Sequence, residues 1–501
     1  MNWHSPEDLA KGATAELDRL TNRIRQKPLS PKDRMAIPAQ EMPAQEPVAR
    51  GKNFREVALG YTPEQARVEA MRCLQCKTKP CVEGCPVRID IPAFVKAMAD
   101  GDWQMAIDTI KMNSLLPAIC GRVCPQETQC QEPCTVGKAL KDVNKAVSIG
   151  RLERFAADWE RNRGIRPPPV AADTGRKVAV VGSGPASLVV AADVRREGHS
   201  VTIFEAFHKL GGVMVYGIPE FRLPKAIVQV EIDTLRAMGV QFKTDFVVGR
   251  TRTIADFMEK DGFDAVFVGT GAGLPKFMNI EGEGLIGVFS ANEYLTRVNL
   301  MKAYDRAIAD TPVMKSHKVV VLGGGNVAMD AARTALRLGA EEVHIVYRRT
   351  EAEMPARVEE VGHAKEEGVL FHILQNAKRI VGDEQGLVTG IECLRYQLGE
   401  PDKSGRPRPV EIPGSEFIMP CDTVIVAIGN DSNPLIAQTS PKIQVTKWGN
   451  IIVDESGETS MKGVFAGGDI VLGAATVILA MGQGRRAAAS INKMLAAPRT
   501  A

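Results

Sequence analysis

The stretch from Lys177 to Glu205 constrains the fold of this chain more than any other part of its sequence. It reads as a short β-branched strand, a glycine turn, a helix and a second strand. Gly182 and Gly184 let the backbone turn tightly and approach a pyrophosphate, whose charge would lie at the helix N-terminus. Glu205, which ends the second strand, can accept a hydrogen bond from a ribose hydroxyl. The stretch therefore predicts a dinucleotide-binding βαβ unit, with Ser187 in place of the usual third Gly or Ala.

A second, similar unit follows further along the chain. Gly323, Gly325 and Ala328 match the pattern G-x-G-x-x-A in full, and the next expected strand ends in Arg348 and Arg349. An acid at that position favours a free ribose hydroxyl, whereas arginines suit a 2′-phosphate. We therefore expect FAD in the first unit and NADPH, rather than NADH, in the second. The alternative is that the two arginines are merely solvated.

Further apolar segments show how the two units are connected. Segments at 264–270, 423–428 and 463–466 are expected strands, and each leads into a glycine-rich turn. Their order implies that one nucleotide domain is inserted in the other. We expect an FAD-binding domain formed by residues 171–310 and 426–501, and an NADPH-binding domain formed by residues 311–425.

The charge and hydropathy of the 501-residue chain exclude several function classes. The formal net charge of +3 is small against 63 basic and 60 acidic residues, so it does not favour nucleic acid or a membrane surface as a partner. The N-terminus lacks a basic-then-apolar signal pattern, and no run of about 18 apolar residues occurs. We therefore expect a soluble, cytoplasmic protein.

The cysteines are concentrated in one block. Eight of the ten lie between Cys73 and Cys134, as C-x2-C-x4-C-x3-C-P followed by C-x3-C-P-x4-C-x3-C. Iron–sulfur clusters need thiolates, and a C-x2-C spacing with a later Cys-Pro resembles bacterial ferredoxin runs. Eight cysteines suffice for two [4Fe–4S] clusters. Structural zinc would need separated CxxC pairs, of which there is one, and disulfides suit a small secreted protein better than this chain.

The first third of the chain is predicted to be mostly helical. Residues 1–55 read as a helix and a proline-rich arm, and residues 56–170 as the helical domain that holds the clusters. A capping box at Thr62 and Gln65 begins the helix that delivers the first two cysteines. The predicted fold class is α/β: an N-terminal α-helical double iron–sulfur domain followed by two nested Rossmann-like nucleotide-binding domains.

These motifs together resemble one known family. The resemblance is to the small (β) subunit of NADPH-dependent glutamate synthase, and it is carried by the cysteine block, GSGPAS, GGVMVYGIPEFRLPK at 211–225, GGGNVAMD, and AGGD with ATVILAMGQGRRAA at 475–488. It covers residues from about 55 to 495. Relatives of that family include the NADPH-binding subunit of ferredoxin:NADP transhydrogenase and the N-terminal part of dihydropyrimidine dehydrogenase.

The resemblance implies a ligand set for each cluster. The first cluster would be held by Cys73, Cys76, Cys81 and Cys134. The second would take Cys85, Cys124 and Cys130, with Glu153 in the following helix as the fourth ligand. Cys120 would then be a spare, small buried residue. Spacing alone does not choose between Cys120 and Glu153.

The resemblance also extends the nucleotide sites. Asp469 matches the late motif whose acid binds the ribityl or pyrophosphate region of FAD, and the helix over 475–488 would begin beside the flavin ring. No catalytic side chain is expected, because hydride transfer needs stacking and orientation more than acid–base groups. The candidate cofactor-binding residues are Gly182, Gly184, Pro185, Ala186, Glu205, Gly211, Gly212, Arg222, Gly271, Gly323, Gly325, Asn326, Val327, Arg348, Arg349, Gly429, Gly468, Asp469, Ala475 and Thr476.

The activity that the resemblance implies is electron input. NADPH would pass a hydride to FAD, and single electrons would leave through two clusters to a large partner subunit like that of glutamate synthase. The alternative among enzymes is the NADPH-binding subunit of a ferredoxin:NADP transhydrogenase or sulfide dehydrogenase, with a ferredoxin-reductase-like partner. A cluster-bearing structural or sensory protein is the alternative outside them. Because no segment remains for a glutaminase or an FMN-bearing barrel, we expect this chain alone to reduce dyes with NADPH without making glutamate.

Overall fold

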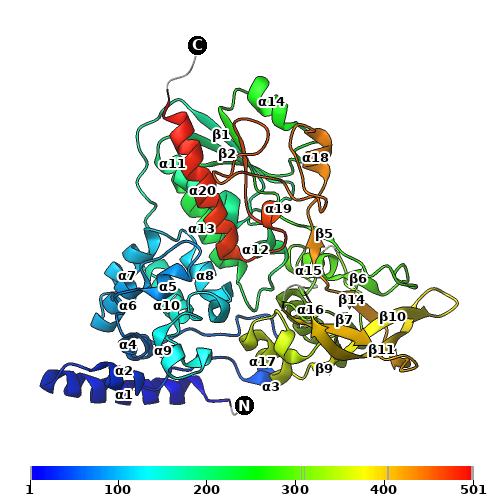
Figure 1. Cartoon of the computed structure of the whole chain (residues 1–501), viewed down its shortest axis with the longest axis horizontal. Coiled ribbons are helices and arrows are strands. Elements are labelled where there is room, and N and C mark those ends of the chain that lie inside the picture. The colour runs from blue at the N-terminus through cyan, green and yellow to red at the C-terminus, as the bar shows by residue number, and fades with distance from the viewer. Residues whose placement is uncertain (1–2, 306, 310, 403–404, 498–501) are drawn as a thin grey trace.

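A helical N-terminal domain and two parallel sheets make up the chain in this computed structural model, which describes residues 3–305, 307–309, 311–402 and 405–497 (Figure 1). The predicted α/β class, with a helical region ahead of Rossmann-like domains, is confirmed. None of the helices in these ranges is long and apolar enough to cross a membrane.

Most helices of the N-terminal domain begin at a proline, which fixes φ where the missing N–H costs nothing. The predicted capping box is present, since Thr62 and Gln65 exchange hydrogen bonds at the start of α4 (Pro63–Met71). The other elements are α1 (Pro6–Gln26), α2 (Pro31–Met35), α3 (Pro47–Arg50), α5 (Pro80–Glu83), α6 (Ile91–Asp100), α7 (Trp103–Lys111), α8 (Pro117–Val123), η1 (Gln126–Thr128), α9 (Thr135–Ala139), η2 (Val143–Lys145) and α10 (Ile149–Arg161).

The first sheet contains the predicted βαβ unit as β1, α11 and β2. Its strand order is β16-β4-β1-β2-β3, and all pairs are parallel. Strand β4 is buried at every position, as expected for an apolar run covered on both faces. The elements are β1 (Lys177–Val181), α11 (Pro185–Arg196), β2 (Ser200–Phe204), α12 (Val213–Tyr216), α13 (Lys225–Ala237), β3 (Gln241–Lys243), α14 (Ile254–Glu259), β4 (Ala265–Val268), α18 (Leu435–Thr439), β16 (Val464–Ala466), α19 (Asp469–Leu472) and α20 (Val477–Leu495).

The second sheet repeats this plan with the strand order β6-β14-β7-β8-β9, again all parallel. Its elements are β6 (Val288–Ser290), α15 (Ala291–Asn299), β7 (Lys318–Leu322), α16 (Asn326–Arg337), β8 (Glu342–Tyr347), η3 (Glu351–Glu353), α17 (Val358–Glu366), β9 (Leu370–Ile373) and β14 (Thr423–Val426). An antiparallel sheet is inserted before β14, made of β10 (Gln375–Gly382), β11 (Val388–Pro401), β12 (Pro407–Glu411) and β13 (Phe417–Pro420).

The two units are nested, because β16 completes the first sheet only after the whole second sheet has been passed. The chain crosses between them at a short antiparallel pair, β5 (Leu274–Pro275) and β15 (Asn430–Asp431). The second sheet begins earlier than the expected boundary at position 311, because β6 hydrogen-bonds to β14. The short strand β6 carries no nucleotide motif, so its sheet is decided by tertiary pairing alone.

One apolar core joins the helical domain to the first unit. Helix α20, drawn in red in Figure 1, lies alongside α11 and points its N-terminal end toward the helical domain. This arrangement places the cysteine block beside the carboxyl ends of the first sheet's strands, where doubly wound sheets bind their ligands.

Candidate cofactor sites

The first glycine turn lies at the carboxyl end of β1. Gly182 has a φ of +90°, and a Cβ there would lie 2.6 Å from the carbonyl oxygen of Gly269. Gly184 precedes α11 and puts no side chain over the first backbone N–H groups of that helix. These N–H groups begin at Ala186, because Pro185 has none, and they form a cradle that fits the pyrophosphate of a dinucleotide.

Three glycines that are distant in the sequence pack closely against the same turn. Gly212, with a φ of +55°, would place a Cβ 2.9 Å from the Cα of Gly184. Gly468 would place one 3.1 Å from the Cβ of Ala186, and Gly484 in α20 would place one 2.6 Å from the Ala186 carbonyl oxygen. The sequence-predicted residues of this site are therefore brought together, because only glycine allows backbones to approach so closely.

Glu205 is positioned at the end of β2 with its carboxylate facing the glycine turn. Its Oε2 accepts hydrogen bonds from the backbone N–H of Ser183 at 2.9 Å and from the Ser183 hydroxyl at 2.5 Å. The same hydroxyl accepts from the Gly211 N–H at 2.9 Å, so it connects the two glycine loops. Sequence reasoning missed this connecting role of Ser183, because the position between the two glycines has no fixed residue type.

Asp469 follows β16 at the other side of the turn. Burial raises the pKa of Asp469 to about 6, although its Oδ1 accepts a hydrogen bond from the Ala475 N–H at 3.3 Å. Thr476 caps α20 by accepting from the Leu479 N–H at 3.3 Å. The N-terminus of this 19-residue helix therefore lies beside Asp469.

The second glycine turn follows β7 in the same way. Gly323 has a φ of +141°, and a Cβ there would lie 2.3 Å from the carbonyl oxygen of Ala427. Gly325 caps α16 without a side chain, and Val327 in its first turn is 41% exposed. The first helical residue, Asn326, accepts a hydrogen bond through Oδ1 from a neighbouring loop. This turn also fits a pyrophosphate.

The two arginines after β8 are in different environments. Arg348 is exposed beside the turn, where a 2′-phosphate could reach it. Arg349 is buried, and it donates from Nε to the Pro407 carbonyl oxygen at 2.9 Å and from Nη2 to Asp402 at 3.1 Å. The structure therefore gives Arg349 a role in holding the antiparallel sheet.

The remaining expected cofactor residues lie at the edges of these turns. Gly271 and Gly429 have positive φ values of +72° and +107° in the loops after β4 and β14. Arg222 instead lies in a buried ion network between the units: it binds Asp330 of α16 at 2.7 Å and Glu360 of α17 at 3.2 Å. Arg222 thus joins the loop after α12 to the second unit.

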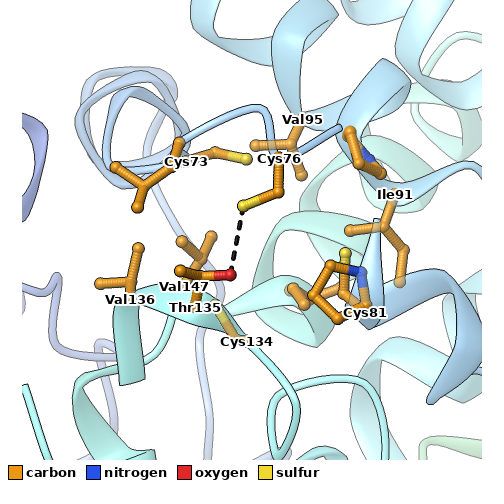
Figure 2. Close-up of a pocket in the computed structure, with 13 residues that line it drawn as sticks. Cys73, Cys76, Cys81, Ile91, Val95, Cys134, Thr135, Val136 and Val147 are labelled. Atoms are coloured by element: carbon orange, nitrogen blue, oxygen red, sulfur yellow. Dashed lines mark hydrogen bonds between the residues drawn. The ribbon is translucent and has the colours of Figure 1, made fainter. Parts of the chain in front are cut away.

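Figure 2 shows the first cysteine group, in which Cys73, Cys76, Cys81 and Cys134 line one cavity with apolar side chains. Burial raises the pKa of Cys73, and burial with the neighbouring thiols raises that of Cys81 to about 12. The Cys76 thiol donates a hydrogen bond to Thr135 Oγ1 at 3.2 Å. Such thiols become thiolates readily only beside a positive charge, which iron would supply.

The second group consists of Cys85, Cys124, Cys130 and Glu153. Burial and then the Glu153 carboxylate raise the pKa of Cys85 to about 11, and burial with Cys85 and Cys124 raises that of Cys130. Glu153 is 6% exposed, burial raises its pKa to about 8, and its Oε1 has no hydrogen-bond partner in the described part of the chain. A buried carboxylate oxygen without a partner is costly, and a metal cluster would satisfy it.

The spread of the thiols agrees with a cluster better than with one ion. Over the described ranges, no three His, Cys, Asp or Glu side chains converge as the ligands of a single metal ion do. The four thiols of the first group are arranged around a cavity instead. A four-iron cluster binds one thiolate at each of its irons, so its ligands surround it in this way.

The segments that carry the second cysteine group lie against α20 of the first nucleotide unit. Cys120 Sγ is 3.4 Å from Met481 Sδ, and Gln129 Nε2 donates to Thr476 Oγ1 at 3.3 Å. A Cβ at Gly482 would lie 3.0 Å from the carbonyl oxygen of Pro86, next to Cys85. No local motif could have indicated Gln129 or Met481, because their partners lie more than 300 residues away.

Comparison with known proteins agrees with the division of the chain into a helical domain and a nucleotide-binding part. Residues 50–165 match the family model of dihydropyrimidine dehydrogenase domain II, 4Fe-4S cluster, and residues 176–484 match that of pyridine nucleotide-disulphide oxidoreductase. Mycobacterium tuberculosis FprA in complex with NADPH shares the fold, with a TM-score of 0.54 at 20% identity over 64% of this chain and 84% of that one.

Relatives in sequence are subunits of several oxidoreductases. The chain is 42% identical to the NADP(+)-dependent formate dehydrogenase subunit beta of Moorella thermoacetica over 83% of its own length, and it spans 60% of that protein. It is 37% identical to the glutamate synthase [NADPH] small chain of Azospirillum brasilense, over 91% of this chain and 94% of that one. The chain therefore belongs to the glutamate synthase small-chain-like family of NAD(P)H-oxidising flavoprotein oxidoreductases, with a 4Fe-4S domain ahead of its nucleotide-binding domains.

Proposed function

We propose that this chain is the electron-input subunit of a larger oxidoreductase, taking electrons from NADPH at FAD and delivering them through two [4Fe–4S] clusters to a partner subunit. One observation carries the proposal: the segments that hold the second cysteine group contact α20, whose N-terminus borders the expected flavin site. Gln129, between Cys124 and Cys130, donates directly to Thr476 at that N-terminus. The loop that carries Cys130 thus contacts the helix that borders the expected flavin site, an arrangement that suits electron transfer.

The chain's own residues would bind and orient the nucleotides. The N–H groups after Gly325 would hold the NADPH pyrophosphate, and exposed Arg348 would pair with the 2′-phosphate. Glu205 would accept from the FAD ribose, while the N-terminus of α20 would favour negative charge on the flavin. When bound, FAD and the clusters would supply the conversion of a two-electron transfer from NADPH into one-electron transfers.

Two ligand sets are proposed for the clusters. The first is Cys73, Cys76, Cys81 and Cys134, which share a cavity. The second is Cys85, Cys124, Cys130 and Glu153, supported by the unpartnered buried oxygen of Glu153. Cys120, whose sulfur contacts Met481 of α20, is left out of the proposed set.

The proposed partner is a large subunit of the glutamate synthase type. Support comes from the extent of the match, since 94% of the Azospirillum brasilense small chain and 94% of the Escherichia coli one are covered. The second candidate is a partner like those of the NADP(+)-dependent formate dehydrogenase or the NADPH-Fe(3+) oxidoreductase. It is favoured by identities of 42% and 39% to the beta subunits of those enzymes.

The test of electron input is anaerobic addition of NADPH to the purified, cluster-loaded chain. We expect the visible flavin absorbance to bleach, an artificial dye to be reduced, and no glutamate to form from glutamine and 2-oxoglutarate. Absence of bleaching would refute electron input and favour a binding role. Glutamate formation without a large subunit would also contradict the proposal. Mass identification of the protein that co-purifies from native extract would decide between the two partner classes.

A further inference from the structure

Arg357 joins the second nucleotide turn to the second cysteine group. It caps α17, and its backbone N–H donates to Asn326 Oδ1 at 3.0 Å, while the N–H of Ala356 donates to the Gly324 carbonyl oxygen at 3.2 Å. The segment that carries Arg357 is therefore attached to the backbone turn that would hold the NADPH pyrophosphate. A shift of that turn on binding would be transmitted to Arg357 directly.

The side chain of Arg357 reaches the opposite way, into the cysteine block. Its Nη2 donates to Gln126 Oε1 at 2.9 Å, its Nη1 donates to the Arg122 carbonyl oxygen at 3.2 Å, and its Nε lies 3.5 Å from Glu127. These three residues flank Cys124 in the sequence.

Both ends of this connection are buried. Arg357 is 8% exposed and Gln126 is 5% exposed, so the contact excludes solvent. An arginine fork held by two acceptors keeps one orientation better than any other cationic side chain. A displacement at one end would therefore reach the other end instead of being absorbed by mobile side chains.

We propose that Arg357 couples occupancy of the second nucleotide turn to the loop between Cys124 and Cys130, so that nucleotide binding tunes the second cluster. This inference rests on the proposed function, because it uses the proposed ligands of that cluster. Coupling of this kind is reciprocal. If nucleotide binding shifts the midpoint potential of the cluster, then the oxidation state of the cluster changes the nucleotide affinity by the same free energy. Arg357 would act as a positioning residue, without contacting either cofactor.

The experiment uses the full chain with FAD and both clusters, with and without saturating NADP+. Hydrogen–deuterium exchange of peptides covering residues 120–131 should slow when NADP+ binds. The midpoint potential of the second cluster, followed by electron paramagnetic resonance, should shift by about 40 mV or more. That shift corresponds to a coupling of about fivefold for a one-electron couple.

Three variants test whether the contact between Arg357 and Gln126 transmits the effect. Arg357→Gln should abolish both the protection and the potential shift, and Gln126→Ala, which removes one of the three contacts, should weaken both. The double variant should behave like Arg357→Gln, because that variant has already lost the contact with Gln126. Gln126→Ala carries the test if Arg357→Gln fails to retain FAD and iron. Arg151→Gln is the matched control, because Arg151 binds Glu359 on the same helix at 3.4 Å but donates its other bond to the Gln40 carbonyl oxygen.

The outcomes separate this inference from the proposed function. If NADPH bleaches the flavin but NADP+ changes neither exchange nor potential, the coupling is refuted and electron input stands. The coupling is also refuted if Arg151→Gln loses the effect as completely as Arg357→Gln. If the flavin does not bleach, electron input fails, whereas protection of residues 120–131 still reports on the contact through Arg357.

Discussion

Glu153 is a buried acidic residue without a complete set of hydrogen-bond partners among the residues that the structure describes. Its carboxylate is buried on α10 among the thiols of the second cysteine group, and one oxygen has no partner over the described ranges. A glutamate in a helix is ordinarily solvated. Burial raises its pKa to about 8, and a positive group bound beside it would instead stabilise the charged carboxylate.

The first prediction concerns this residue. Glu153→Ala should remove the second cluster, so that iron falls from about eight to about four atoms per chain, because one ligand of four is lost. Cys120→Ala should retain about eight, because Glu153 and not Cys120 is the proposed fourth ligand. Iron and flavin content are measured on the same anaerobic samples. Retention of iron in Glu153→Ala together with its loss in Cys120→Ala would reverse the ligand assignment.

The second prediction separates the two arginines after β8. Arg348→Gln should raise the KM for NADPH about 10- to 100-fold, because a charge-assisted hydrogen bond is worth about 1.5–3 kcal/mol, and should leave the KM for NADH unchanged. Steady-state dye reduction measures both constants. Arg379→Gln, which alters an exposed arginine of the antiparallel sheet paired with Glu392, is the control. An equal effect on the KM values for NADPH and NADH would show that Arg348 does not bind the 2′-phosphate.

At the scale of elements, α20 connects the sites. It packs on α11 so closely that a Cβ at Gly484 would lie 2.6 Å from the Ala186 carbonyl oxygen. It also packs on the cysteine block through Met481 and Gly482. The run of small residues in this helix thus serves two interfaces, both of which need close backbone approach.

The third prediction tests this packing. Gly484→Ala should cost about 1–3 kcal/mol of stability, as overpacking does, and should weaken FAD retention because it pushes α20 away from the glycine turn. Gly12→Ala in α1 has open space around the new methyl group and should be neutral or stabilising by up to about 1 kcal/mol. Denaturant midpoints and flavin content measure both. Normal FAD retention in Gly484→Ala would contradict the close packing.

At the scale of the whole molecule, the helical domain and the first unit share an interface that contains buried charge. Glu231 on α13 is 7% exposed beside the ion pair of Lys111 and Glu160, which are 2.6 Å apart. Burial raises the pKa of Glu231 to about 8, with Glu160 adding to the shift and Lys111 opposing it. The folded chain therefore holds a proton that the unfolded chain releases at a lower pH.

The fourth prediction follows from the sign of this shift. Stability from Glu231 is complete below its ordinary pKa and is lost as pH rises through about 8, by an amount on the order of a few kcal/mol. Glu231→Gln should therefore gain stability over the unsubstituted chain at about pH 8.5 but not at about pH 4.5. Unfolding midpoints measure the difference. Asp233→Asn, an exposed change on the same helix, should show no such pH dependence. A stability gain that is equal at both pH values would show that the Glu231 carboxyl is not the group that holds this proton.

The sequence by itself determined the parts that depend on local rules. Glycine spacing predicts the two βαβ units, since a tight turn into a helix admits little else at Gly182 and Gly323. The capping box at Thr62 and the helical start of the chain depend on neighbouring residues only, and both are present. The clustering of the cysteines likewise predicts a metal-binding domain without reference to the rest of the chain.

Only the tertiary structure decided how distant residues meet. Arg222 and Arg349 carry the same charge as Arg348, yet burial gives them partners in ion and hydrogen-bond networks. Strand β6 joins the second sheet because of its hydrogen bonds to β14. Local sequence specifies turns and caps through short-range geometry, whereas the partner of a buried charge is set by which surfaces pack together. Arg357 and Glu153 acquire their proposed roles only through that packing.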